Sequence, residues 1–202
     1  QERSRGNNKN DEMETMLDIF DSQLSESGYE IIRMRRAFVK MLEEYASEAQ
    51  YRISNSKEEI EIRIAESVTC DNSNQFKESL NKNRARDIYN GSSTIGPHRD
   101  DIEFVINGVD AKKYASQGQQ RTIALSLKMA EIKIVRKLLG ENPVLLMDDV
   151  MSELDIDRQR FLLNEIDNVQ LFITSTEINE ELKDKLKNST IFEVKQGKIQ
   201  KN

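Results

Sequence analysis

The sequence predicts an α/β fold preceded by a mostly helical region, and three observations lead to this prediction. Residues 11–52 carry apolar side chains at helical spacing. From about residue 91 onward, helix-like and strand-like segments alternate. Two of the strand-like segments, PVLLMDD (143–149) and VQLFITST (169–176), flank a helix-like one, which is typical of parallel strands joined by a helix. We therefore expect two regions, a helical one over 1–90 and an α/β lobe over 91–202.

Composition limits the class of protein. The chain has 202 residues, of which 33% are charged, with a formal net charge of −6. No apolar run approaches the roughly 18–20 residues that cross a bilayer, and no signal-like segment opens the sequence. The single cysteine, Cys70, excludes an intramolecular disulfide and is typical of a reducing cytosol. These features predict a cytoplasmic protein without membrane contacts, and they predict that Cys70 is structural.

Within the first region the polar residues 1–10 predict a frayed start. Apolar residues then recur at helical spacing, but SESG (25–28) predicts a break. Ile60, Ile62 and Ile64 alternate with charged residues, which indicates a half-buried strand. We expect helices over 11–24, 29–52 and 74–89.

Two groups of cations lie on these predicted helices, and both have two interpretations. Each is either a solvated helix face or a surface that follows DNA phosphates, since local charge, not net charge, governs non-specific affinity. Few aromatic residues accompany them, so base stacking is not expected to be the main contact. The two groups are Arg33, Arg35, Arg36 and Lys40, and Lys82, Arg84 and Arg86.

The second region begins with a hairpin signal, because the Asn107–Gly108 pair separates two apolar segments. An amphipathic helix is expected to follow the polar cluster and to end near Leu139. After the strand at 143–149 we expect a helix over about 157–166 and the strand at 169–176. A short charged helix and a closing hairpin around Gln196–Gly197 are expected to complete the chain.

The strand PVLLMDD ends in adjacent carboxylates, Asp148 and Asp149. Its apolar residues do not alternate with polar ones, which predicts burial on both faces. Ligands of open α/β sheets lie beyond the carboxyl ends of strands. Two acids there suit a hard cation and an attacking water. The alternative is a strand end that turns into a helix with an acidic cap, and Asp155 in the following SELD could equally be an N-cap.

The cluster YASQGQQRT (114–122) opens a helix. A helix N-terminus presents unpaired N–H groups and a positive dipole end, which suits phosphate oxygens. Ser116 adds a hydroxyl, Gln119 adds an amide, and Gly118 lets the backbone approach an anion closely. We interpret the cluster as an anion clamp, because an ordinary capped helix would need only Ser116.

The order of SQGQQ, PVLLMDD and SELD resembles that of ATP-binding-cassette ATPases, where they correspond to the signature motif, the Walker B strand and the D-loop. Within this superfamily, three longer stretches resemble the RecF family of bacterial recombination mediators. The resemblance extends more loosely from about residue 11. The three stretches are TIGPHRDDIEF (94–104), ASQGQQRTIALSLKMAE (115–131) and PVLLMDDVMSELD (143–155).

The resemblance implies the C-terminal half of an ABC-type ATPase head with a helical arm segment inserted before it. It implies ATP and Mg²⁺ as cofactors, and an ATP-dependent homodimer of the full-length protein. It also implies binding to DNA at single-strand gap junctions, where RecR and RecO help such proteins load a recombinase.

Roles follow from the resemblance residue by residue. It implies that Asp148 orders Mg²⁺ and that Asp149 stands where many cassette ATPases have a catalytic glutamate. The remaining positions are implied to contact nucleotide held by the opposite subunit. They are Ser116, Gln117, Gly118 and Gln119 of the signature and Ser152 and Asp155 of the D-loop. His98 and Arg99 are either loop residues or contacts to nucleotide, DNA or the neighbouring lobe.

Two features depart from the superfamily pattern. No GxxxxGK[ST] motif occurs, so we expect the phosphate-cradling loop upstream of this chain and little or no ATPase activity from the chain alone. The switch histidine of transporter cassettes is replaced by ITSTE, which disfavours a transporter nucleotide-binding domain. The other alternative is a chromosome-organising or break-repair ATPase with long coiled coils, which the predicted break at Gly28 disfavours.

Overall fold

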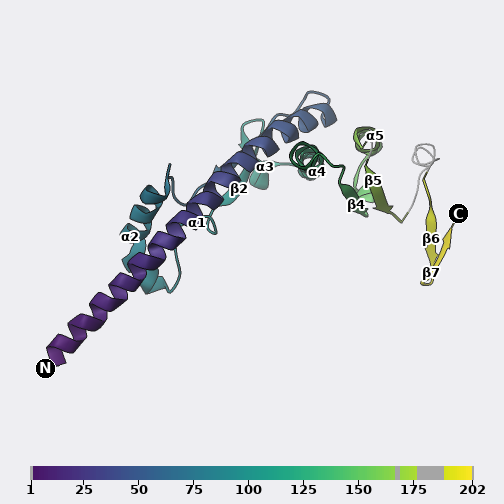
Figure 1. Cartoon of the computed structure of the whole chain (residues 1–202). Helices are drawn as coiled ribbons and strands as arrows, with labels where there is room; N and C mark the ends of the chain where they lie inside the picture. The colour runs from purple at the N-terminus through teal and green to yellow at the C-terminus, as the bar shows by residue number, and fades with distance from the viewer. Residues whose placement is uncertain (1, 167–168, 177–188, 202) are drawn as a thin grey trace. The chain divides into compact units, whose positions relative to one another are not determined.

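The computed structural model describes residues 2–166, 169–176 and 189–201, without the side chains of 2–10, 152–153 and 201. By its internal contacts the chain forms two compact units, 1–130 and 131–202. Figure 1 shows the elements along the chain. This division reflects packing contacts alone. The predicted boundary near residue 90, between a helical region and an α/β lobe, stays a prediction.

The first unit is organised around one long helix, α1 (Glu2–Ile53). The predicted start near Asp11 and the predicted break at 25–28 are both wrong, since the helix begins at Glu2 and is continuous to Ile53. The hydroxyl of Ser25, which is buried, donates to the Ser22 carbonyl oxygen at 2.8 Å, so this polar residue is satisfied inside the helix. The continuous helix also removes the argument against a coiled-coil ATPase that relied on the break.

Gly28 explains why SESG interrupts the pattern without ending the helix. A Cβ atom at Gly28 would lie 2.5 Å from Cε1 of Phe76, whose side chain is buried. The glycine therefore allows a second helix to approach closely, and its sequence signal reflects packing between helices. Phe76 and Leu80 of that helix form a buried cluster with Ile32 and Cys70.

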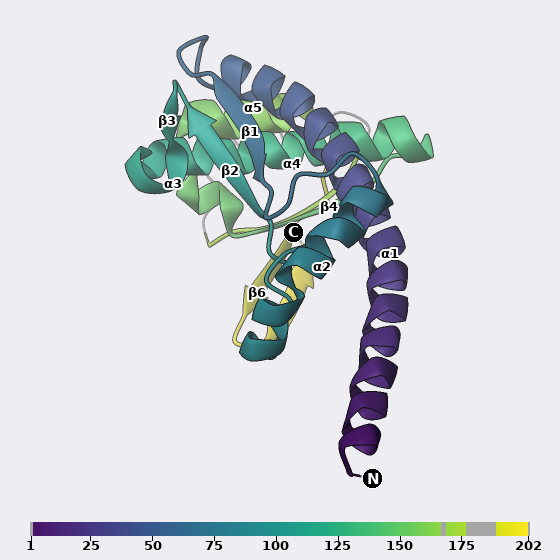
Figure 2. The same cartoon turned by 90° about the vertical axis from the view of Figure 1, so that its left-hand side faces the viewer.

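The second helix of this cluster is α2 (Ser73–Asn90), which packs against α1 and diverges from it toward its own end (Figure 2). The Asn72 side chain caps its first turn by accepting a hydrogen bond from the Gln75 N–H at 3.0 Å. At its other end Gly91 adopts φ 67°, the left-handed conformation that favours glycine after a helix. The sequence predicted this helix within one residue at each end.

A three-stranded antiparallel sheet packs against the C-terminal half of α1. Ile60 and Ile62 are buried, as are Ala46 and Ala49 of α1. Asn107 and Gly108 both have positive φ, which confirms the predicted hairpin turn. A short helix, α3 (Ala111–Tyr114), follows the sheet. The strands, paired in the order given, are β1 (Ile60–Ala65), β2 (Asp101–Ile106) and β3 (Val109–Asp110).

Helix α4 (Gln117–Leu139) ends at Leu139, as predicted. It begins in the first unit and continues into the second. The second unit contains β4 (Val144–Asp148), the short 3₁₀ helix η1 (Val150–Glu153), α5 (Ile156–Glu165) and β5 (Gln170–Thr174). Strands β4 and β5 pair in parallel, which confirms the predicted arrangement of strand, helix and strand. A final antiparallel hairpin joins β6 (Phe192–Lys195) to β7 (Lys198–Lys201) through Gln196 and Gly197.

One prediction for β4 is wrong. Leu145 and Met147 are buried, but Val144 and Leu146 are 56% and 73% exposed, so the strand is covered on one face only. β4 has a single neighbouring strand among the described residues, and its open face shows the apolar residues that the sequence placed in a core. The predicted short charged helix after residue 176 falls largely outside the described residues. Among the described helices, none combines the length and apolarity that a bilayer crossing requires.

Candidate functional site

The acidic corner, which we define as Asp148, Asp149 and Thr174, lies where the two parallel strands end. Asp148 and Thr174 are the last paired residues of β4 and β5. The Thr174 hydroxyl donates to Oδ1 of Asp148 at 2.5 Å. The two strands therefore bring a carboxylate and a hydroxyl together at the edge where open α/β sheets bind ligands.

Asp149 has an unusual backbone conformation. Its φ of 54° and ψ of 15° lie in the left-handed region, which non-glycine residues adopt at a cost. Its N–H donates to the carbonyl oxygen of Thr174 at 3.2 Å and to the Thr174 hydroxyl oxygen at 3.0 Å. Thr174 thus holds the peptide at which the chain turns from β4 into η1.

The residues of this corner fit Mg²⁺ with nucleotide. Among the described residues no group of three or more His, Cys, Asp or Glu side chains could hold a metal ion. Mg²⁺ is usually bound through one or two carboxylates, substrate phosphates and water instead of a full protein cage. An exposed carboxylate at Asp148, oriented by a hydroxyl, matches this donor set.

The SELD segment follows the corner directly. The backbone of Ser152 lies in η1, and Asp155 precedes α5. The Asp155 carboxylate accepts from the Arg158 N–H at 2.9 Å and also pairs with the Arg158 guanidinium. Asp155 is therefore an N-cap, the alternative that the sequence left open, while its contact with nucleotide stays a prediction.

The polar cluster at the start of α4 forms a capping box. The Ser116 hydroxyl oxygen accepts from the Gln119 N–H at 3.2 Å, and Oε1 of Gln119 accepts from the Ser116 N–H at 2.9 Å. The Gln120 amide donates to the Ala115 carbonyl oxygen at 3.3 Å. The argument that an ordinary cap needs only Ser116 is therefore wrong, because both glutamines also serve the helix start.

The first turns of α4 are connected to α1 by buried polar side chains. The Thr122 hydroxyl donates to the Gly118 carbonyl oxygen at 2.9 Å. One turn further on, the Ser126 hydroxyl lies 2.8 Å from both the Thr122 carbonyl oxygen and Oε1 of Gln50. Gln50, Thr122 and Ser126 are all fully buried. These contacts fix the helix that carries Gln117 and Gly118 against the end of the long helix.

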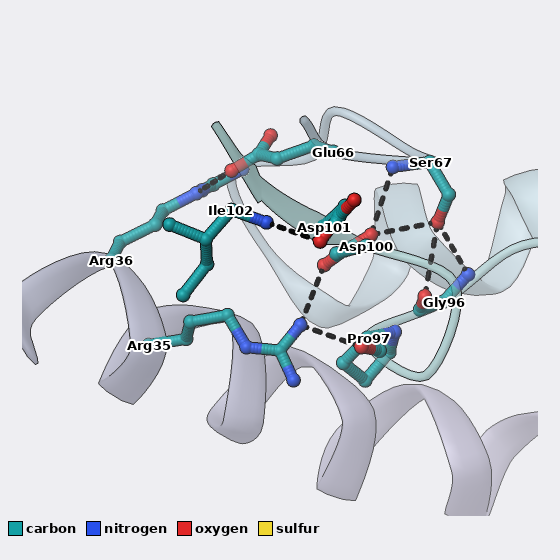
Figure 3. A network of polar contacts seen from close by, with 9 residues as sticks. All are labelled: Arg35, Arg36, Glu66, Ser67, Gly96, Pro97, Asp100, Asp101 and Ile102. Atoms are coloured by element: carbon teal, nitrogen blue, oxygen red, sulfur yellow. Dashed lines mark hydrogen bonds and ion pairs between the residues drawn. The ribbon is translucent and has the colours of Figure 1, made fainter. Parts of the chain in front are cut away.

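The stretch GPHRDD forms a loop whose polar side chains serve the fold (Figure 3). Oδ1 of Asp100 accepts from the Ser67 N–H and the Ser67 hydroxyl, both at 2.8 Å. Oδ2 of Asp100 pairs with Arg35 of α1 at 3.0 Å, and the Asp100 side chain is only 3% exposed. The Arg99 guanidinium and the His98 ring both lie within hydrogen-bonding distance of the Ser93 carbonyl oxygen.

The first group of cations divides, since Arg35 and Arg36 form contacts within the fold whereas Arg33 and Lys40 are exposed. Arg35 donates to the Pro97 carbonyl oxygen at 2.5 Å in addition to its pair with Asp100. Arg36 forms two hydrogen bonds with the Glu66 carboxylate (Figure 3). It also donates to the Cys70 carbonyl oxygen at 2.8 Å. The hydrogen bonds that Arg36 donates to the Glu66 carboxylate raise the pKa of Arg36. Both earlier interpretations of this face overlooked that these two arginines tie α1 to the loop and sheet.

The second group divides in the same way. Arg84 pairs with Asp18 and Asp21 of α1, each at 2.5 Å, and these hydrogen bonds raise its pKa. Lys82 and Arg86 are exposed on α2. Arg84 is thus a contact between the two helices, and only its neighbours retain the predicted interpretations as solvated or phosphate-binding cations.

The chain is similar in sequence to RecF proteins of several bacteria. No family model matches the chain. The DNA replication and repair protein RecF of Clostridium perfringens is 44% identical over 189 residues, which cover 93% of this chain and 52% of that protein. RecF of Enterococcus faecalis is 44% identical over 196 residues, covering 92% and 52%. RecF of Streptococcus gordonii is 46% identical over 191 residues, with the same coverage.

Solved structures that match the chain are also RecF proteins. The recombination mediator protein RecF of the RecFOR pathway, as RecF-ATP, matches with a TM-score of 0.78 at 34% identity. That match covers 93% of this chain and 50% of the solved chain. RecF-ATPrS matches with a TM-score of 0.76 at the same identity.

The chain is homologous to RecF. It spans about half the length of the RecF proteins that it matches. The predicted α/β class is confirmed, since the mixed helix and strand architecture is that of RecF, an ABC-type ATPase.

Sequence reasoning placed Asp148 and Asp149 correctly at a strand end, but it missed two residues that position the motifs. In the sequence Thr174 stands out only as part of ITSTE, the stretch without histidine. Alignment of the carboxyl ends of the two predicted parallel strands is the signal that places it beside Asp148. Gln50 gave no signal, because a lone glutamine near the end of an amphipathic helix has no pattern of its own. Signature residues and the acidic corner belong to different units, and their meeting across two subunits stays a prediction.

Proposed function

We propose that this chain is half of the ATPase of a RecF-type DNA repair protein, and that it supplies the signature helix and the acidic corner of the nucleotide site. One observation carries the proposal: a carboxylate and a hydroxyl meet at the ends of two parallel strands, next to a second aspartate, in a chain homologous to RecF. ATP is supported as the nucleotide by the RecF-ATP structure that the chain matches.

Each residue of the acidic corner has a role in this proposal. Asp148 would bind Mg²⁺ through its carboxylate, and the bound ion would neutralise charge on the β- and γ-phosphates. Asp149 would accept the proton of the water that attacks the γ-phosphate. Its side chain is one methylene shorter than the glutamate of many cassette ATPases, so we expect slow hydrolysis.

The start of α4 would contact the γ-phosphate held by a second subunit. Its N-terminal N–H groups and dipole favour an anion, and Gly118 leaves room for close approach. The Ser116 hydroxyl and the Gln119 amide now stabilise the helix start. A phosphate would therefore have to share or replace the capping hydrogen bonds. The signature contact would depend on dimerisation, because the second subunit holds the phosphate.

The wider function follows from the same homology. We propose an ATP-dependent homodimer of the full-length protein that acts in the cytoplasm at junctions of single- and double-stranded DNA. RecR and RecO are its proposed partners in loading a recombinase. The exposed cations Lys82 and Arg86 remain candidates for phosphate contacts, whereas Arg35 and Arg36 do not, because they hold the fold.

The experiment measures ATP hydrolysis and nucleotide binding by variants of the full-length protein. Asp149→Asn should reduce turnover by at least about a hundredfold, as expected for loss of a general base, with nucleotide binding retained. Ser116→Arg should abolish turnover by blocking the phosphate approach. The matched control Lys57→Met changes an exposed residue remote in sequence from both motifs and should leave turnover unchanged. Wild-type turnover in Asp149→Asn would contradict the proposed catalysis.

A different class of ATPase is the second candidate. The continuous helix α1 is compatible with a chromosome-organising or break-repair ATPase with coiled coils. RecF identity of 44% over 93% of the chain favours the first candidate. A transporter nucleotide-binding domain is not supported by any observation on this chain.

A further inference from the structure

Thr174 makes three polar contacts at the acidic corner, more than a residue that merely ends a strand requires. Its hydroxyl donates to Oδ1 of Asp148 at 2.5 Å. The same hydroxyl oxygen lies 3.0 Å from the Asp149 nitrogen and accepts its N–H, and the Thr174 carbonyl oxygen accepts that N–H at 3.2 Å. A hydroxyl has one hydrogen and accepting lone pairs, so a single side chain can serve both aspartates at once.

The backbone at Asp149 shows why such a contact matters. A left-handed φ of 54° at a non-glycine residue persists only where its surroundings hold it. Two hydrogen bonds of the Asp149 N–H lead to Thr174, one to its hydroxyl oxygen and one to its carbonyl oxygen. The direction in which the chain leaves β4, and with it the position of the Asp149 side chain, therefore depends on the end of β5.

We propose that Thr174 is the positioning residue of the acidic corner, orienting Asp148 toward the cation and holding Asp149 in its left-handed turn. This inference rests on the proposed function. Thr174 acts through the two aspartates and touches neither nucleotide nor metal in this role. The class of ligand whose binding it governs is a divalent cation bound together with a nucleoside triphosphate.

The exposure of the site separates this role from a structural one. Thr174, Asp148 and Asp149 are all exposed, so loss of the hydroxyl should change the stability of the fold little. Partners that orient a metal-binding side chain instead affect metal affinity, and their loss typically weakens it by about 10–100-fold. Cation affinity is therefore the quantity that a positioning role changes and a purely structural role leaves unchanged.

The experiment uses the full-length protein with Mn²⁺ as the probe and a non-hydrolysable ATP analogue, and it measures Mn²⁺ affinity by electron paramagnetic resonance. Thr174→Val removes the hydroxyl at nearly constant volume and should weaken Mn²⁺ binding roughly tenfold. Thr174→Ser keeps the hydroxyl and should bind within about twofold of wild type. The matched control Thr15→Val removes an exposed threonine hydroxyl, bonded only to its own helix, from the other unit.

A double-substitution test keeps the inference falsifiable. If Thr174 acts through Asp148, then Thr174→Val should cause no further loss of Mn²⁺ affinity when added to Asp148→Asn. Wild-type affinity in Thr174→Val, or fully additive losses in the double variant, would overturn the positioning role and leave the proposed function standing. Failure of the wild-type protein itself to bind Mn²⁺ with the nucleotide would instead overturn the proposed function, and this inference with it.

Discussion

The chain contains two pairs of adjacent aspartates, and their surroundings differ completely. Asp100 is 3% exposed, and both of its carboxylate oxygens bind groups that join α1 to a loop. Asp148 and Asp149 are exposed at the end of two parallel strands, one held by a hydroxyl and the other in a left-handed turn. Asp100 belongs to the scaffold of its unit, whereas Asp148 and Asp149 lie at the strand ends where open α/β sheets bind ligands.

The difference shows what a motif alone leaves undecided. Both pairs lie in stretches that resemble RecF, so resemblance does not separate a structural acid from a functional one. The distinction lies in where the hydrogen bonds go. Asp100 uses its oxygens within the protein, whereas the acidic corner orients its oxygens at an exposed sheet edge.

The largest expected effect is on stability, at Asp100. Asp100→Ala should lower the free energy of unfolding by about 3 kcal/mol, because it removes the carboxylate that pairs with a partly buried Arg35 and accepts from the Ser67 N–H. Urea unfolding followed by circular dichroism measures this loss. Asp101→Ala is the matched control, since the Asp101 side chain is 75% exposed and should cost less than about 0.5 kcal/mol. Equal effects of the two substitutions would contradict the structural role.

Cys70 gives a local readout of the same loss. Its side chain is 1% exposed, and burial raises the pKa of its thiol, so both exposure and thiolate content are low near neutral pH. Alkylation of Cys70 in the wild type should therefore require local opening of the first unit. Asp100→Ala should accelerate alkylation and Asp101→Ala should not. The Cys70 carbonyl oxygen also accepts from Arg36, which connects the backbone beside the thiol to α1.

A smaller effect is expected at Ser67. Its hydroxyl contacts Asp100 and the Gly96 backbone, where it accepts the Gly96 N–H at 2.9 Å. Ser67→Ala should lower the free energy of unfolding by about 1–2 kcal/mol, the usual effect of leaving such partners unmet. Ser67→Thr keeps the hydroxyl and provides the comparison. No loss in the alanine variant would show that water replaces this contact.

The smallest effect on stability is expected at Asp149, and it has the opposite sign. Asp149→Gly should raise the free energy of unfolding by roughly 0.5–1 kcal/mol, because glycine adopts a positive φ without strain. Gln196→Gly is the matched control, since Gln196 also has a positive φ, 49°, in the hairpin of β6 and β7. Both variants should gain stability, but only Asp149→Gly should lose ATP turnover in the full-length protein. Retained turnover would place Asp149 outside catalysis.

Local patterns predicted most elements of the fold. Period-two isoleucines predicted β1, the Asn107–Gly108 pair predicted a hairpin, and an apolar run ending in Asp148 predicted β4. The continuity of α1 could not be predicted, because Gly28 locally signals a break in the helix. The glycine is needed for the close approach of Phe76, which belongs to a helix far away in sequence. Tertiary packing overrides local propensity in such a case.

The candidate site was predicted in part for the same reason. Strand ends and a polar helix start are local features, so Asp148, Asp149 and Ser116 were found. The contacts of Thr174, Gln50 and Arg35 join residues far apart in sequence, and a single sequence contains no record of them. From the sequence alone, Arg35 and Arg36 are therefore indistinguishable from exposed cations of a helix face.

The central claim is that signature residues and acidic corner act together only between two subunits. Its most direct test mixes two inactive full-length variants, Ser116→Arg and Asp149→Asn, and measures ATP hydrolysis. Half of the dimers should then contain one intact site, so turnover should recover to about a quarter of the wild-type rate for a symmetric homodimer. Turnover that stays at the level of the separate variants would contradict a site shared between two copies.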